Sequence, residues 1–201
     1  MFRRSSNVIN SIICVGGAHT SGAKCVNDYS RVADDPNKKT LNIQDDPHPD
    51  NKANAYWVHI TPVMQIGTLL VSKPHWDNLN IMFNALDYVR RKQHPEDTIA
   101  VVGFEKWTSG SDVKDVIDFH EQLKSMNVPH IMFNTSEHLD VPPENQYDFG
   151  DSYIDPYNPA GTMVSQLKAQ NIDFNPGTEY FGIDGHKRWA RVLLKYLTQI
   201  A

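Results

Sequence analysis

Cysteine, long apolar runs and surplus positive charge are all scarce in this sequence. Its 201 residues include two cysteines, Cys14 and Cys25, without a ligand spacing to histidine, so we expect reduced, structural thiols. No stretch reaches the roughly 20 apolar residues of a membrane span, and no apolar segment precedes position 12 as in a signal peptide. A formal net charge of −5 argues against nucleic-acid binding. We therefore expect a protein that is neither secreted through a signal peptide nor transmembrane.

The length and the ordinary share of apolar and charged residues fit one globular domain over residues 1–201. We find no internal repeat and no linker. Apolar, β-branched runs predict strands, and apolar residues at helical spacing predict helices between them. The strands are expected at 8–15, 98–104 and 128–133, with a short one at 40–43, and the helices at 78–92, 112–126, 160–170 and 184–197.

Two further segments are less regular. Residues 55–71 are apolar without a clean period and predict a helix interrupted at Pro62, and residues 134–160 predict a long loop. Strands that alternate with helices indicate a three-layer α/β/α, flavodoxin-like fold with a parallel sheet of about four or five strands. Ligands bind such sheets beyond the carboxyl ends of the strands, so the loops 16–22, 105–110 and 134 onward are the candidate site.

The first of these loops, GGAHTSG at 16–22, follows an apolar strand. It resembles the G-D-S-x-T-x-G loop of the SGNH (GDSL-type) hydrolases, with Gly17 in place of the Asp and Ala18 in place of the nucleophilic Ser. The C-terminal part, YFGIDGH at 180–186 followed by Trp189, resembles the family's last block. The resemblance places Tyr180 where the catalytic His stands, Gly177 where its Asp partner stands, and Glu105 where the Asn of the oxyanion hole stands.

The blocks 148–159 and 180–194 also resemble small SGNH-like proteins encoded by tailed phages of marine cyanobacteria. The resemblance implies an SGNH-hydrolase-like fold whose catalytic positions are substituted. Ester hydrolysis by that route needs a hydroxyl nucleophile, a neutral imidazole and oxyanion donors. Ala18 has no nucleophilic group, Tyr180 is a poor base at neutral pH, and an ionised Glu105 would repel an oxyanion. We therefore expect no catalytic residues at these positions and favour a non-catalytic protein, while enzyme activity itself stays open.

If chemistry survives, the candidate residues are Ser21 and His19 in the first loop, Ser152 in the literal GDS string at 150–152, and His186 at the start of the last helix. Ser152 lacks the preceding strand that a nucleophile turn requires, so we interpret it as a loop serine. The acidic turn around Asp45, Asp46, His48 and Asp50 matches no calcium-loop spacing, and we expect neither metal nor cofactor.

Three functions remain open at this point. The first is a non-catalytic structural or accessory component of a virion, such as a capsid decoration or a tail protein, with protein partners or self-association and a place in the virion or the host cytoplasm. The second is an ester hydrolase for acylated glycans or lipids with a displaced serine. The third is a glycan-binding module with stacking aromatic residues, namely Trp57, Trp76, Trp107, Tyr153 and Tyr157.

Overall fold

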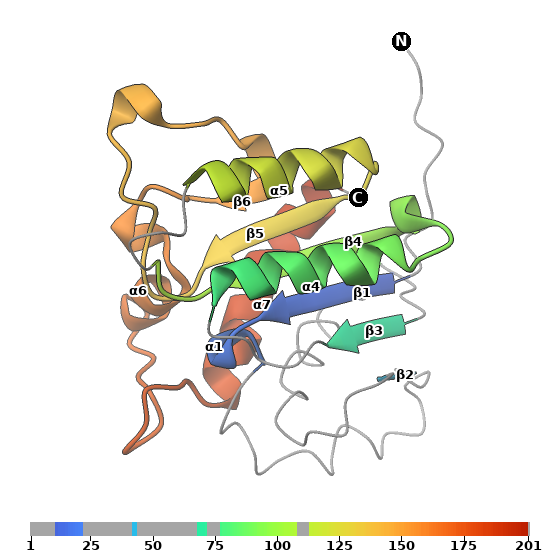
Figure 1. The fold of residues 1–201 in the computed structure, drawn as a ribbon. Helices are drawn as coiled ribbons and strands as arrows, with labels where there is room; N and C mark the ends of the chain where they lie inside the picture. The colour runs from blue at the N-terminus through green and yellow to red at the C-terminus, as the bar shows by residue number, and fades with distance from the viewer. Residues whose placement is uncertain (1–10, 22–41, 44–67, 72–76, 108–112, 201) are drawn as a thin grey trace.

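The computed structural model describes residues 11–21, 42–43, 68–71, 77–107 and 113–200. These residues form one parallel sheet with strand order β2-β3-β1-β4-β5-β6 (Figure 1). The four longer strands are β1 (Ser11–Gly16), β3 (Thr68–Val71), β4 (Thr98–Phe104) and β5 (His130–Asn134), and the two-residue strands β2 (Asn42–Ile43) and β6 (Tyr153–Ile154) lie at the edges. The predicted parallel α/β class is confirmed.

The helices cover both faces of this sheet. One face carries α4 (Asn78–Arg90) and α5 (Val113–Ser125), which pack on alternate strand residues such as Ile13 and Val102. The other face carries α6 (Met163–Lys168) and α7 (Ile183–Ile200), which pack on the residues between, such as Ile12 and Val101. Figure 1 shows α4 and α5 in front of the sheet and α7 behind it. Every residue of β4 and β5 is buried, as expected for central strands covered on both sides.

Local sequence explains where these helices begin and end. Asp77 caps α4, because its side chain accepts a hydrogen bond from the Leu79 backbone N–H at 2.9 Å. Thr162 caps α6 in the same way, by accepting from the Ser165 backbone N–H at 3.2 Å. The predicted helix at 160–170 is therefore shorter, because Pro159–Gly161 forms a separate 3-10 turn before the cap. None of the helices in the described ranges is long and apolar enough to span a membrane.

Two predictions about the irregular segments need correction. Within the predicted helix at 55–71, Thr68–Val71 is strand β3 and pairs with Ser11–Cys14 of β1, while residues 55–67 lie outside the described part. The predicted loop at 134–160 contains β6 and the 3-10 turns Pro143–Asn145 and Gly150–Ser152. A short apolar run carries no period that separates a strand from a helix, and a two-residue strand has no pattern of its own.

Candidate functional site

The strand order places a topological switch point between β1 and β4. If β2 is set aside, the order β3-β1-β4-β5-β6 is the 2-1-3-4-5 order of doubly wound sheets, in which chain connections leave in opposite directions from the first strand. Gly16 at the end of β1 pairs with Gly103 near the end of β4. The loops after these strands, which the sequence marks as the candidate site, therefore open side by side at the carboxyl edge.

Two glycines and a threonine close this edge of the sheet. The four-residue helix α1 (Ala18–Ser21) follows β1 and brings Thr20 back over the strands. A Cβ atom at Gly16 or at Gly103 would overlap the Thr20 side chain, so both glycines are required for this approach. Thr20 is 1% exposed, and its Oγ1 has no hydrogen-bond partner among the described residues. The threonine of the GGAHTSG loop is thus a packing residue between β1 and β4.

Glu105 follows β4 directly and lies in the centre of the site. Its side chain is 4% exposed and packs on Gly17, where a Cβ atom would overlap the carboxyl group. The backbone N–H of His19 donates to Glu105 Oε1 at 3.3 Å, and Thr135 Oγ1 lies 3.0 Å from Oε2. Thus Glu105 fills the space beside the loop that follows β1 and accepts a hydrogen bond from the backbone N–H of His19.

Burial changes the protonation of Glu105. It raises the pKa of the carboxyl group from its ordinary 4.5 to about 7, against the hydrogen bonds from Thr135 and His19 and the charge of Lys106, which lower it. Thr135 Oγ1 lies 2.8 Å from Phe104 O as well as 3.0 Å from Glu105 Oε2, yet a hydroxyl has one proton to donate. Both contacts are satisfied when the neutral carboxyl donates to Thr135 and Thr135 donates to Phe104 O. Near neutral pH, Glu105 is therefore present in both its protonated and its ionised form.

His19 and Tyr180 form the other side of the site. Their ring centroids are 5.1 Å apart, and the ring of His19 also lies 6.2 Å from Phe174 and 6.4 Å from Phe181. Burial lowers the pKa of His19 to about 4, with a smaller opposing effect of Glu179 and a further lowering by Lys106. Burial, then the charges of Glu105 and Glu179, raises the pKa of the Tyr180 phenol. At neutral pH both groups are uncharged.

Gly177 occupies a turn and not a catalytic position. Residues 175–178 form a β-turn in which the Thr178 N–H donates to Asn175 O at 3.0 Å, with Pro176 at the second place. Gly177 takes the third place with φ +72°, the left-handed value that a type II turn requires there, and a Cβ atom would meet nothing within 4 Å. The backbone conformation itself explains why glycine stands at position 177.

His186 is the other imidazole near this edge. It lies in the first turn of α7, is 1% exposed, and its backbone N–H donates to Gly182 O at 3.2 Å. Burial, and secondarily the charge of His19, lowers the pKa of His186 to about 4. The electrostatic coupling shows that the first loop and the last helix approach each other. The helix predicted at 184–197 begins one residue earlier, at Ile183, so Asp184 lies in its first turn.

The candidate serines are not brought together. Ser21 ends α1 in the first loop, whereas Ser152 ends a 3-10 turn before β6, whose Tyr153 pairs with Met132 in the middle of β5. The edge strand β6 is three strand spacings from β1, a separation of about 14 Å. Ser152 is therefore remote from the Ala18 loop, which agrees with a loop serine.

Several residues that hold the site carry no sequence pattern. Asn78 accepts from the Glu105 backbone N–H at 3.0 Å and donates to Lys106 O at 3.1 Å, so α4 positions the segment after β4. Asn134 accepts from Trp107 Nε1 at 3.0 Å and from the Tyr153 hydroxyl at 2.7 Å. These contacts join residues that are 19 to 28 positions apart in the sequence, so no local sequence pattern predicts them.

The arrangement defines a class of protein: a parallel α/β domain with a buried carboxyl group of raised pKa at its switch point. Within the described ranges no three His, Cys, Asp or Glu side chains converge as metal ligands, and the acidic turn at 45–50 lies outside those ranges. Comparison with protein-family models, with curated proteins and with solved structures finds no significant match.

Proposed function

We propose that this chain is a non-catalytic, SGNH-hydrolase-like protein that serves as a structural or accessory component of a phage virion. The family and the phage setting rest on the two sequence blocks named above. The absence of catalysis rests on one observation, the contact of Glu105 with the first loop. The His19 N–H, a backbone donor beside the nucleophile position, is bound to an internal carboxyl group instead of facing a substrate.

The other groups at this edge support the same proposal. Ala18 carries no hydroxyl, Tyr180 has a raised pKa, and His186 has a pKa lowered to about 4 by burial. A general base for ester hydrolysis would need a hydrogen-bonded nucleophile within reach. Glycan binding by the proposed aromatic residues gains no support either, since Tyr153 is buried and Trp107 donates to Asn134. Trp57 and Trp76 lie outside the described residues.

A hydrolysis assay tests the absence of catalysis. We expect the purified full chain to release p-nitrophenol from short-chain esters at the background rate. Ser21→Ala and Ser152→Ala should give the same rate, because neither serine is expected to act as a displaced nucleophile. Turnover by the natural chain that either substitution abolishes would contradict the proposal and identify an active hydrolase.

An exposed apolar pair on α4 supports a role in assembly. Leu79 and Phe83 stand one helical turn apart and are 47% and 65% exposed. Exposed apolar side chains that lie together are typical of protein contacts. We expect Phe83→Ser to lower the molar mass measured by light scattering at high protein concentration, and Arg90→Ser on the same helix to leave it unchanged. A monomeric natural chain would exclude self-association through this pair.

A further inference from the structure

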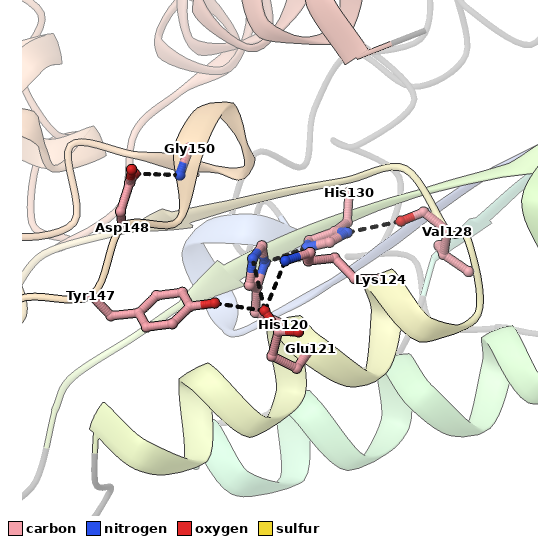
Figure 2. Close-up of polar contacts among 8 residues, drawn as sticks. All are labelled: His120, Glu121, Lys124, Val128, His130, Tyr147, Asp148 and Gly150. Carbon is pink, nitrogen blue, oxygen red and sulfur yellow. Dashed lines mark hydrogen bonds and ion pairs between the residues drawn. The ribbon is translucent and has the colours of Figure 1, made fainter. Parts of the chain in front are cut away.

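A pocket of about 300 Å³ lies away from the switch point, between the loop around residue 147 and the segment after β6. Four aromatic residues line it, namely Tyr147, Phe149, Tyr153 and Tyr157, together with Asp148. Figure 2 shows how the loop that carries Tyr147, Asp148 and Gly150 faces α5. The volume is at the lower end of the roughly 300–1,000 Å³ of small-molecule sites, so it suits a compact group.

The rings of this pocket are held in place by one another. Phe149 lies with its centroid 4.8 Å from that of Tyr147 and 5.1 Å from that of Tyr153, both in edge-to-face geometry, and 6.4 Å from Tyr157. The ring of His120 on α5 packs against this cluster, with its centroid 5.3 Å from that of Phe149. A ligand would therefore meet rings that are already ordered, which lowers the entropy lost on binding.

The phenol hydroxyls of the pocket are all committed to protein partners. Tyr147 donates to Glu121 Oε1 at 2.6 Å, and Tyr153 donates to Asn134 Oδ1 at 2.7 Å. The Tyr157 hydroxyl accepts from the Tyr147 backbone N–H at 2.9 Å and lies 3.0 Å from Tyr147 O. The Gln146 side chain, which also lines the pocket, donates to Val141 O at 3.0 Å. The pocket thus presents ring surface beside polar groups that are already engaged by the protein, which disfavours a sugar and favours a ligand that binds π-systems.

The charges around the pocket have one sign. Asp148 is the ionised side chain in its lining, and among the described residues no lysine, arginine or histidine lines it. The Asp148 Oδ1 atom accepts from the Gly150 backbone N–H at 2.8 Å, which fixes the carboxylate at the rim. The Glu121 carboxylate accepts a hydrogen bond from the Tyr147 hydroxyl and so enriches the ring in electron density (Figure 2). Lys124, 2.9 Å from Glu121, offsets part of that charge.

We propose that this pocket binds the quaternary ammonium group of a small organic cation. Ring surfaces attract a cation through their quadrupole, and recognition of quaternary ammonium by aromatic residues uses this effect. The methyl groups of such a cation fill an apolar pocket without hydrogen bonds, while its charge is complementary to Asp148. A primary ammonium would instead need hydrogen-bond acceptors, and the Tyr157 hydroxyl is already engaged.

The test uses the full chain with choline and with 3,3-dimethylbutan-1-ol, its uncharged isostere, in NMR titrations that follow aromatic ring signals. We expect choline to bind in the millimolar range and the isostere to bind at least about tenfold more weakly, because it lacks the charge. Asp148→Asn should weaken choline binding by about fivefold and still accept from the Gly150 N–H. The matched variant Asp173→Asn, an exposed carboxylate beside Phe174, should leave the affinity unchanged.

Either of two outcomes would overturn the proposal. Equal binding of choline and its isostere would show an apolar pocket without selection for charge. No shift of the Tyr147, Phe149 or Tyr157 ring signals at choline concentrations of tens of millimolar would show that the pocket binds no quaternary ammonium. Because Asp148→Asn replaces an exposed side chain and keeps its turn contact, its result does not depend on a variant that fails to fold.

Discussion

Glu105 links the end of β4 to the loop that follows β1. A short amide at this place would leave the His19 N–H for a substrate, but the longer acid reaches Gly17 and binds that N–H itself. The carboxyl group is buried, and the free-energy cost of burial is reduced because a pKa of about 7 keeps the group partly protonated near neutral pH. Glu105 thus engages the backbone N–H of His19 and is also a structural contact between the segment after β4 and the first loop.

A pH series on Glu105→Gln tests this interpretation. The folded pKa of Glu105, about 7, exceeds its ordinary 4.5, so the contribution of this one group to stability is lost as pH rises from 4.5 through 7. Glutamine keeps an acceptor for the His19 N–H and a donor for Thr135 but does not ionise. We expect the variant to gain about 3 kcal/mol over the natural chain between pH 4.5 and 8, measured by urea unfolding. The exposed control Glu144→Gln should show no such trend, and parallel curves for Glu105→Gln and the natural chain would contradict the burial argument.

The sequence predicted some of these residues and missed others for a physical reason. Glu105, Tyr180 and His19 follow strands or lie in a recognisable block, and the structure places them around one edge. Thr135 and Asn78 act through contacts 30 and 27 residues distant in sequence, so no motif marks them. Gly177, predicted as a lost catalytic position, is explained by the turn that it forms.

At the scale of elements, α1 can pack close to the sheet because Gly16 and Gly103 have no side chains at the point of contact. Gly103 sits in β4 between the Thr20 hydroxyl and the ring of Phe133. We expect Gly103→Ala to destabilise the fold by about 2 kcal/mol or more, because a methyl group must displace one of these neighbours. Thermal unfolding of the variant and of the natural chain measures this cost.

A second substitution identifies the neighbour that is displaced. Removing the Thr20 hydroxyl in Gly103→Ala/Thr20→Ala should recover part of the loss, so that the two changes are non-additive by about 1 kcal/mol. Thr20→Ala alone should be milder than Gly103→Ala, because the hydroxyl has no hydrogen-bond partner among the described residues. If the two substitutions instead changed the free energy of unfolding additively, the added methyl group would collide with Phe133 and not with Thr20.

Helices and central strands were the elements that the sequence predicted well. The strand at 98–104 coincides with β4, and the helices at 78–92 and 112–126 differ from α4 and α5 by one or two residues at their ends. These elements carry a full period of apolar residues. The short strands β3 and β6 were missed, since pairing with a neighbouring strand, not a local pattern, makes them strands.

For the whole molecule, buried histidines set the response to acid. Burial lowers the pKa of His19, His130 and His186 from 6.5 to about 4 each. His130 is fixed in this state, because its Nδ1 lies 2.8 Å from Val128 O and its Nε2 lies 2.8 Å from His120 Nδ1, so His130 donates to the carbonyl and accepts from His120 (Figure 2). A proton on the accepting nitrogen would break the bond between the two rings.

These shifts predict a chain that is stable near neutral pH and unfolds on mild acidification. A histidine with a lowered folded pKa contributes stability above its unfolded value of 6.5, and that contribution is lost as pH falls toward 4. Glu105 acts in the opposite direction between 4.5 and 7, so between pH 5 and 6 the unfolded chain binds an excess of about two protons. We expect the free energy of unfolding to fall by about 2–3 kcal/mol per pH unit there. Urea titrations at pH 5.0, 5.5 and 6.0 measure the slope, which His130→Gln should reduce by about half; a flat or inverted dependence would mean that these imidazoles are not buried in the neutral form.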